Sequence, residues 1–440
     1  MCGIVGYVGK KQAVPILMDG LSKLEYRGYD SAGVAVMQDG EIKIKKSKGR
    51  LAVLQEKLDS GEPLSGVMGI GHTRWATHGE PSDTNSHPHL SRSGRFAVVH
   101  NGIIENYMKL RQMLINKGFE FISETDTEVI AQLVEYYYNG DIVETLTKVV
   151  ERVEGSYALG ILCADNLDSF VAVRKESPLI VGLGEGENFI ASDVPAILAH
   201  TRDVYFLEND EIVLLDAENV KVYNLDGEEI KKESYHVEWD ISAAEKGGYE
   251  HFMFKEIMEQ PRVIRDTVQP RIRDGKIVLD DISLTAEYIK GINKIYIVAC
   301  GSAYHVGVVG KYVIEAMTRV PVEVTVASEF RYMNPIVDDK TLTVVISQSG
   351  ETADTIAAMR EAKRLGSRTF AIVNAVGSAI AREADDVLYT WAGPEISVAT
   401  TKAYSTQVTA IYLLSLYIAQ ELNMIDDETL KTKLDALEKL

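Results

Sequence analysis

Cys2 carries two groups that could do chemistry once Met1 is removed, a thiol and a free α-amine. Initiator methionine removal is favoured when the residue after it is small, as cysteine is. An α-amine has a pKa of about 8 and a thiol one of about 8.5, so the amine can take the thiol proton at neutral pH. This arrangement predicts a nucleophile with its own general base. The alternative is an incidental cysteine on an edge strand.

Polar residues follow two further strand-like segments of the first half. Arg74 ends the segment 67–73 and could clamp a carboxylate with two parallel hydrogen bonds, with Trp75 beside it as an apolar lid. Asn101 and Gly102 end the segment 96–100, and an amide side chain plus a glycine N–H could stabilise an oxyanion. Asp126 could hold an ammonium group. Each has a simpler interpretation, a turn for Asn101–Gly102 and helix capping for Asp126.

Five histidines fall within a short stretch of the first half: His72, His78, His87, His89 and His100. No cysteine or carboxylate joins them at a recognised ligand spacing, and His87 and His89 flank a proline in a polar loop. We therefore interpret them as local hydrogen-bonding residues and expect no metal site.

Two serine-rich loops of the second half precede helices. Residues 300–304 (CGSAY) contain Ser302, and residues 347–352 (SQSGET) contain Ser347, Gln348 and Ser349. Hydroxyls and helix N-terminal amides together can cradle a phosphate without lysine. Neither a Walker motif nor a Gly-x-Gly-x-x-Gly motif is present, so no nucleotide cofactor is indicated. Simple helix capping is the alternative.

The elements that position these residues differ between the two halves. The first half has short strands and an apolar-periodic helix over 13–24, and we expect a sheet sandwich covered by helices. The second half alternates apolar strands with helices, which is typical of a parallel sheet covered on both faces. Its expected strands are 295–299, 322–327, 342–346, 370–373 and 387–389. Ligands of such sheets bind beyond the carboxyl ends of the strands.

Composition excludes several classes of protein. The 440 residues are 46% hydrophobic and 25% charged, which is ordinary for a globular protein and long enough for two domains. A net charge of −19 argues against nucleic acid and anionic membrane as partners. No apolar run approaches the length of a membrane span. Three cysteines give no disulfide framework, so we expect a cytoplasmic protein.

Five motifs of the first half resemble the glutaminase domain of the glutamine–fructose-6-phosphate aminotransferases, the glucosamine-6-phosphate synthases. They are residues 2–6 (CGIVG), 24–33 (LEYRGYDSAG), 72–79 (HTRWATHG), 99–106 (VHNGIIEN) and 124–128 (ETDTE). The resemblance implies Cys2 as nucleophile and base, and Asn101 with Gly102 as oxyanion hole. It implies that glutamine is held by Arg74 and Asp126 at its two α-groups, with Thr77 and His78 lining the pocket and Trp75 gating ammonia.

Further segments of the second half are similar to the same family. Residues 249–261 resemble its interdomain helix, and residues 347–355 and 395–403 resemble its sugar-isomerase domain. The resemblance implies fructose 6-phosphate as ligand, with phosphate on Ser347, Ser349 and Thr352. Gln348, Ser302 and Val398 would lie nearby. Many relatives have Thr-Ser where this chain has Ser302-Ala303, so Ala303 supplies no hydroxyl there.

The fold class expected is an αββα N-terminal nucleophile sandwich followed by a doubly wound parallel-sheet domain. We expect the glutaminase domain at 2–238, a linker and interdomain helix at 239–285, and the sugar-isomerase domain at 286–427. Residues 428–440 would begin the connection to a second sugar-isomerase domain, which, with the C-terminal tail, holds the remaining synthase residues of the family.

The function expected is therefore glutamine hydrolysis with transfer of ammonia to fructose 6-phosphate, giving glucosamine 6-phosphate. We expect these 440 residues alone to retain glutaminase activity only, and the complete protein to be a homodimer. Two alternatives remain open. One is another glutamine amidotransferase, making phosphoribosylamine or asparagine, although its second half leaves no signature here. The other is a sugar-phosphate-binding regulator without activity.

Overall fold

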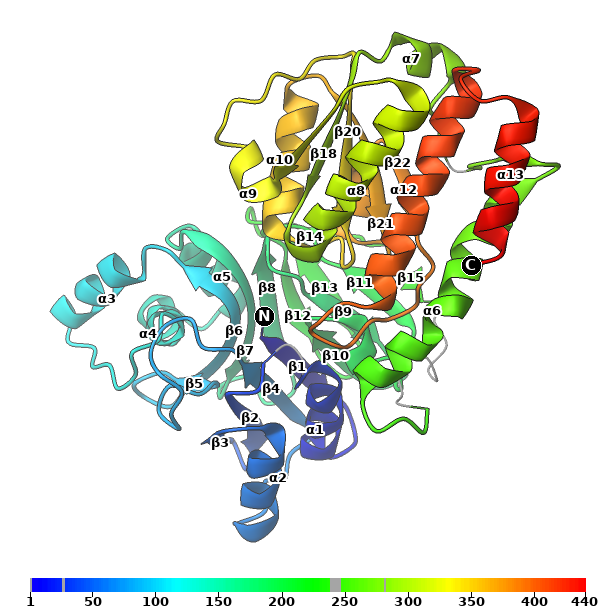
Figure 1. Cartoon of the computed structure of the whole chain (residues 1–440). Helices are drawn as coiled ribbons and strands as arrows, with labels where there is room; N and C mark the ends of the chain where they lie inside the picture. Colours follow the sequence, from blue (N-terminus) through cyan, green and yellow to red (C-terminus); the bar gives the residue numbers. More distant parts are fainter. Residues whose placement is uncertain (1, 26–27, 238–246, 281) are drawn as a thin grey trace. The chain divides into compact units, whose positions relative to one another are not determined.

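The computed structural model describes residues 2–25, 28–237, 247–280 and 282–440 (Figure 1). The chain forms two compact units, Met1–Ile241 and Ser242–Leu440. The predicted domain boundary at 238–239 lies outside the described residues. Each unit has its own hydrophobic core, and each is described by itself below.

The first unit contains two antiparallel sheets. The 8-stranded sheet has the order β15 (Tyr235–His236), β11 (Asp203–Phe206), β9 (Ile180–Leu183), β10 (Asn188–Ala191), β1 (Gly3–Val8), β4 (Met68–Arg74), β2 (Ser31–Gln38) and β3 (Glu41–Lys48). The 7-stranded sheet has the order β14 (Glu229–Ile230), β13 (Val220–Tyr223), β12 (Ile212–Leu215), β8 (Phe170–Lys175), β7 (Gly155–Cys163), β6 (Phe96–Ile104) and β5 (His89–Leu90).

Alternation along the strands builds four layers. Successive side chains of a strand point to opposite faces, so β1 places Ile4 and Val8 in a core shared with Ala97 of β6, between the sheets. Tyr7 faces outward to a core with α1 (Ala13–Leu24) and α2 (Leu51–Ser60). The second sheet is covered by α3 (Tyr107–Asn116), α4 (Thr127–Tyr137) and α5 (Ile142–Val150). The αββα sandwich and the helix over 13–24 are confirmed.

The second unit contains a 5-stranded sheet in which every pair is parallel. Its order is β19 (Val322–Val326), β18 (Lys294–Ala299), β20 (Thr341–Ser347), β21 (Arg368–Val373) and β22 (Asp386–Tyr389). The chain moves from β18 to β19 on one side and then returns to β20 on the other. The order therefore reverses between β18 and β20, which is where ligands bind in such sheets.

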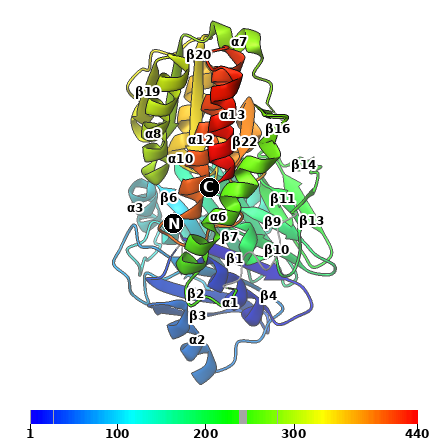
Figure 2. The same ribbon diagram turned by 45° about the vertical axis from the view of Figure 1, so that its right-hand side comes forward.

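Helices cover both faces of this parallel sheet, as Figure 2 lets the reader follow. One core includes residues of α6 (Phe252–Val268), α7 (Ala286–Gly291), α8 (Gly301–Thr318), α12 (Lys402–Glu421) and α13 (Asp427–Glu438). The opposite core includes α9 (Ala327–Phe330), α10 (Ala353–Arg364) and α11 (Ala379–Glu383). The doubly wound architecture is confirmed. The remaining short elements are β16 (Ile272–Arg273), β17 (Lys276–Ile277) and the 3-10 turns Val194–Ala196 and Gln269–Arg271.

One helix differs from the sequence-based expectation, which assigned residues 428–440 to a connecting segment. The acidic segment after residue 422 forms α13, because Leu430, Leu434 and Leu437 recur at helical spacing and are buried. The interdomain helix expected within 239–285 is α6, which runs to Val268 with Pro261 inside it.

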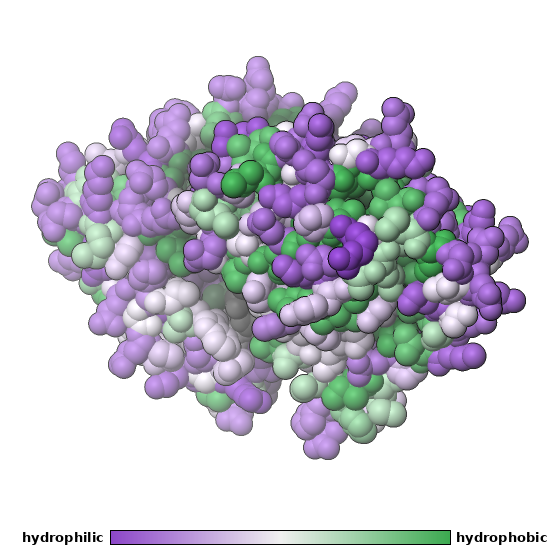
Figure 3. All heavy atoms as spheres, turned by 45° about the horizontal axis from the view of Figure 1, so that its top comes forward, coloured by the Kyte–Doolittle hydropathy of each residue, from purple (hydrophilic) through white to green (hydrophobic). Residues whose placement is uncertain are grey.

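On the face shown in Figure 3, hydrophilic residues are interspersed with apolar areas. Within the described ranges, no helix combines the length and apolar character needed to cross a bilayer.

Candidate active site

Cys2 lies where two strands of the first sheet begin and end. β1 and β4 are antiparallel, with Gly3 opposite Thr73, so the start of β1 meets the end of β4. The backbone N–H of Trp75 donates to Cys2 Sγ at 3.2 Å. Burial raises the pKa of the Cys2 thiol, whereas the Trp75 N–H and the Arg74 guanidinium favour the thiolate. The thiol thus needs a base to act as a nucleophile near neutral pH.

Asn101 reaches this cysteine from the opposite sheet. Its side-chain Nδ2 donates to the Cys2 carbonyl at 2.9 Å, and its Oδ1 lies 3.0 Å from His72 Nε2. Gly102 follows with φ +122°, and a Cβ there would lie 2.0 Å from the Ser156 carbonyl oxygen, so only glycine fits. The side chain of Asn101, one of the two expected oxyanion donors, therefore lies next to Cys2, and Gly102 follows it in β6.

Arg74 and Asp126 place a buried cation and a buried anion in the same region. Arg74 is 3% exposed and donates to the carbonyls of His78 and Gly79, yet its Nη1 is buried without an acceptor among the described residues. Asp126 is 4% exposed and accepts from the Ile104 N–H at 2.9 Å. Leaving a guanidinium nitrogen without a hydrogen-bond partner is costly, so this nitrogen is available to donate to a carboxylate.

Asp126 occupies the N-cap position of α4, but its side chain makes no capping hydrogen bond. The N–H of Glu128 donates to Thr125 Oγ1 at 3.3 Å, and the Glu128 carboxylate accepts from the Ser123 N–H. These two bonds satisfy backbone N–H groups at and before the start of the helix. The carboxylate of Asp126 instead accepts from the N–H of Ile104.

The loop after β4 carries the other predicted residues of this site. Trp75 is 44% exposed, and its ring meets that of Tyr29 edge to face, with centroids 5.2 Å apart. His78 Nδ1 lies 3.9 Å from Asp126 Oδ1 and 3.4 Å from Thr77 Oγ1. The loop thus carries one exposed aromatic and two polar side chains, of which His78 lies beside Asp126.

Four histidines form a stack beneath the site. The rings of His72 and His87 stack with centroids 4.2 Å apart, and His87 also approaches His89 and His100 at 4.9 and 6.5 Å. The expectation that His87 and His89 lie in a polar loop is wrong, because both are buried against the other rings. Among the described residues no group of three or more His, Cys, Asp or Glu could hold a metal.

The second unit brings the two serine loops to adjacent strands. Ser347 ends β20, and its Oγ accepts from the Gly350 N–H at 3.0 Å and lies 3.2 Å from Thr352 Oγ1. Ser349 Oγ accepts from the Glu351 N–H at 3.2 Å. Ser302 lies exposed in the first turn of α8, directly after the neighbouring strand β18. Both loops open at the carboxyl edge, beside the strand-order reversal.

Asn374, which the sequence analysis missed, connects the Ser347 loop with the segment before α12. Its N–H donates to the Gln348 carbonyl at 3.2 Å, and its side chain donates to the Gly393 carbonyl at 2.7 Å. The segment that follows holds Val398, which is 70% exposed. The buried carboxylate of Glu256 accepts from the Ser397 N–H and fixes this segment. A polar residue directly after a buried parallel strand was the available signal for Asn374.

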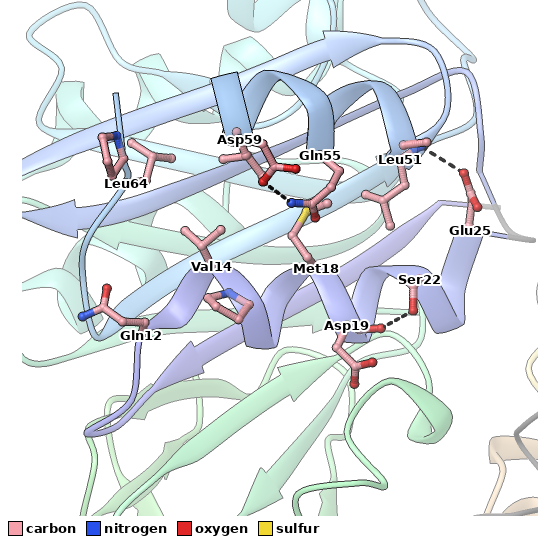
Figure 4. Close-up of a pocket in the computed structure, with 14 residues that line it drawn as sticks. Gln12, Val14, Met18, Asp19, Ser22, Glu25, Leu51, Gln55, Asp59 and Leu64 are labelled. Atoms are coloured by element: carbon pink, nitrogen blue, oxygen red, sulfur yellow. Dashed lines mark hydrogen bonds between the residues drawn. The ribbon is translucent and has the colours of Figure 1, made fainter. Parts of the chain in front are cut away.

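A separate groove of about 710 Å³ lies between α1 and α2 (Figure 4). Val14, Met18 and Leu51 line it, and Glu25 at its edge accepts from the Leu51 N–H. None of the residues predicted from sequence to act on a ligand lines this groove.

Comparison with known proteins gives the class first. Residues 72–199 match the family model described as a glutamine amidotransferase domain, and residues 288–417 match that of the SIS domain. The chain therefore joins an amidotransferase domain to an SIS domain.

The whole chain then aligns with proteins that have this organisation. It is 64% identical to the glutamine–fructose-6-phosphate aminotransferase (isomerizing) of Caldanaerobacter subterraneus subsp. tengcongensis, over 100% of this chain and 72% of that protein. It is 62% identical to the protein of the same name from Clostridium tetani, over 98% of this chain and 71% of that protein. The chain belongs to the family of glutamine–fructose-6-phosphate aminotransferases.

Solved structures are similar over parts of the chain. The C-terminal domain of glucosamine-fructose-6-phosphate aminotransferase from Francisella tularensis is 40% identical over 44% of this chain and 55% of that one, with a TM-score of 0.43. Glutamine phosphoribosylpyrophosphate amidotransferase from B. subtilis is 17% identical over 89% of this chain and 91% of that one, with a TM-score of 0.47.

Proposed function

We propose that this protein hydrolyses glutamine at Cys2 and that the ammonia released aminates fructose 6-phosphate, giving glucosamine 6-phosphate and glutamate. The observation that carries the proposal is the meeting of Cys2, Asn101 and the unsatisfied Arg74 Nη1 at one end of the sandwich. The membership of the chain in the aminotransferase family supports both substrates.

The glutaminase step uses these groups in sequence. Arg74 binds the α-carboxylate of glutamine and Asp126 binds its α-ammonium, so the side-chain amide extends toward Cys2. After Met1 is removed, the α-amine of Cys2 takes the thiol proton, and the sulfur attacks the amide carbon. The Asn101 side chain and the Gly102 N–H stabilise the oxyanion. The protonated nitrogen leaves as ammonia, and water then cleaves the thioester to give glutamate.

The residues around this centre take supporting roles in the proposal. Thr77 and His78 line the glutamine pocket, and Trp75 gates the passage of ammonia. In the second unit, Ser347, Ser349 and Thr352 bind the phosphate of fructose 6-phosphate, with Ser302, Gln348 and Val398 beside the sugar. The hydroxyls at the N-terminus of α10 support this assignment, because helix N-terminal amides favour anions.

The test combines the chemistry of Cys2 with the state of the N-terminus. We expect mass spectrometry of the mature protein to find Cys2 first, and glutamate to appear when glutamine is added. The Cys2→Ala variant should fold and bind glutamine without releasing glutamate. A wild-type protein that retains Met1, or that releases no glutamate, would contradict the glutaminase proposal and favour a sugar-phosphate-binding regulator.

The remaining proposals concern organisation. We propose the domain limits 2–238 and 286–427, and the linker and helix 239–285. We also propose a homodimer and a cytoplasmic location. The three cysteines are free, which fits a reducing compartment.

A further inference from the structure

His72 is completely buried under the nucleophile and touches Asn101 rather than the substrate region. Its Nε2 lies 3.0 Å from Asn101 Oδ1 and 2.9 Å from the carbonyl oxygen of His100. Its Nδ1 is buried without a hydrogen-bond partner among the described residues. The ring stacks on His87, which fixes its plane.

The polarity of this network follows from one backbone carbonyl. The His100 carbonyl can only accept, so His72 Nε2 must carry the hydrogen and donate. The side-chain atom of Asn101 that shares this donor must then be the oxygen. The other end of the amide is consequently the NH₂ group, which faces the Cys2 carbonyl at 2.9 Å.

The amide of Asn101 has two N–H groups, and the Cys2 carbonyl uses one of them. The second is free to donate to the oxyanion. If the amide were flipped, Asn101 would present an oxygen to the developing negative charge and to the Cys2 carbonyl, and both contacts would be repulsive. The orientation of one amide therefore decides whether the oxyanion hole exists.

We propose that His72 is a positioning residue for glutamine hydrolysis, which as the neutral Nε2–H tautomer locks the Asn101 amide in the orientation that donates to the oxyanion. This proposal rests on the glutaminase function proposed above. His72 acts through Asn101 and touches neither glutamine nor Cys2 Sγ.

Burial supports the neutral form. It lowers the pKa of His72 to about 3, and the neighbouring Arg74 and His100 act in the same direction. The ring therefore carries a single N–H near neutral pH, and the His100 carbonyl selects Nε2 for it. A doubly protonated ring would gain a second N–H at Nδ1, for which the described surroundings offer no acceptor.

The experiment separates positioning from simple packing by side-chain geometry. Gln has an amide nitrogen at the reach of imidazole Nε2, Asn has one only at the reach of Nδ1, and Phe fills the volume without a donor. We expect His72→Phe and His72→Asn to lower kcat for glutamine hydrolysis about 100- to 1000-fold, the cost of one oxyanion donor. KM should change little, because Arg74 and Asp126 still hold glutamine. His72→Gln should restore kcat to within about tenfold of wild type.

His89→Phe is the matched control, since His89 is buried in the same stack but its Nε2 lies 3.0 Å from Thr125 rather than Asn101. We expect its kcat to stay close to that of wild type. A folded His72→Phe variant with wild-type kcat, or a His72→Gln variant as inactive as His72→Phe, would overturn the proposal.

A measurement on the wild-type protein keeps the test decisive if the variants fail to fold. Proton–nitrogen NMR correlation of ¹⁵N-histidine-labelled full chain distinguishes the two tautomers. We expect His72 to be the neutral Nε2–H form at pH 7. An Nδ1–H tautomer or a charged ring would refute the proposal that His72 fixes the orientation of the Asn101 amide. If the wild-type protein did not hydrolyse glutamine, the proposed function would fail while the tautomer assignment remained testable.

Discussion

At the scale of single residues, the site depends on groups that are left incomplete. Arg74 gives one nitrogen to backbone carbonyls and keeps Nη1 buried without an acceptor among the described residues. Asp126 accepts one backbone N–H through Oδ2, and its Oδ1 lies 3.9 Å from His78. Buried polar groups are usually hydrogen-bonded. The unpaired nitrogen of Arg74 and the carboxylate of Asp126 therefore mark where a ligand that carries both a negative and a positive group would bind.

Replacing Arg74 by lysine tests this interpretation, because lysine keeps the charge but loses the planar fork. We expect Arg74→Lys to raise KM for glutamine about 10- to 100-fold, the equivalent of one lost charge-assisted hydrogen bond of about 1.5–3 kcal/mol. Steady-state assays of glutamate release measure it. Arg95→Lys, at a side chain that is 47% exposed, serves as control and should leave KM unchanged. An unchanged KM in Arg74→Lys would exclude the carboxylate clamp.

At the scale of elements, strand ends and helix starts carry the chemistry. β1 and β4 belong to one sheet and β6 to the other. Cys2 precedes β1 and Arg74 ends β4, whereas Asn101 lies within β6, where it is paired with Ala158, and its side chain reaches Cys2. In the second unit, β18 and β20 are parallel neighbours, so the loops that open α8 and α10 meet at one edge. The ladders fix the backbone of Arg74, Asn101 and Ser347, and the side chains of these residues project from the strands.

Gly102 tests how tightly β6 is constrained. We expect Gly102→Ala to lower the unfolding temperature more than Gly118→Ala. Both glycines have positive φ, but a Cβ at Gly118 meets nothing within 4 Å whereas one at Gly102 collides with the Ser156 carbonyl. Gly118→Ala, the control, should lower the free energy of unfolding by about 1–2 kcal/mol through backbone strain alone. Thermal unfolding of both variants gives the comparison, and equal losses would show that the local sheet relaxes around the new methyl group.

Ser347 tests the phosphate loop of the second unit. We expect Ser347→Ala to weaken binding of fructose 6-phosphate about 10- to 100-fold, because it removes a hydroxyl ligand and leaves the Gly350 N–H without its acceptor. Calorimetric titration of the full chain provides the measurement. Ser415→Ala is the matched control, since Ser415 is equally buried but bonds only within its own helix. Equal affinities in both variants would rule out this loop as the phosphate site.

At the scale of the whole molecule, folding encloses titratable rings that the unfolded chain exposes to water. Burial lowers the pKa of His72 to about 3 and lowers the pKa values of His87, His89 and His100 as well. Arg74 opposes the charged form of His72, His87 and His89, whereas Asp126 favours that of His100. The unfolded chain thus binds protons more tightly than the folded one.

The contribution of these neutral histidines to the free energy of unfolding should therefore be fully present above the pKa of a histidine in the unfolded chain, about 6.5, and should decrease as the pH falls below that value. When the pH falls from 7.5 to 5.5, His72 alone should lower the free energy of unfolding by about 1.4 kcal/mol. The other three histidines should lower it further. Urea unfolding at the two pH values checks this. His87→Phe should reduce the pH dependence, whereas a change at His251, whose side chain is 73% exposed, should not. Constant stability over this range would contradict the neutral stack.

The outline of the fold could be predicted from local pattern. The helix over 13–24 and the strands of the parallel sheet follow from apolar periodicity, which depends only on neighbours in the chain. Residues 428–440, expected to be a connecting segment, instead belong largely to α13, in which three leucines recur at helical spacing. The packing of those leucines against the main core of the second unit decided the outcome.

The sequence by itself determined which residue types were present for chemistry: a cysteine next to Met1, an arginine and an asparagine after apolar strands, and hydroxyls before helices. Only the tertiary structure decided which of these side chains are held in a fixed orientation, and which neighbouring residues hold them. The roles of His72 and Asn374 depend on contacts with residues distant in the chain, and the buried stack of His87 and His89 depends on both sheets closing over it. The physical reason is that a hydrogen bond or a lowered pKa depends on distance and solvent exclusion in space, which spacing along the chain does not specify.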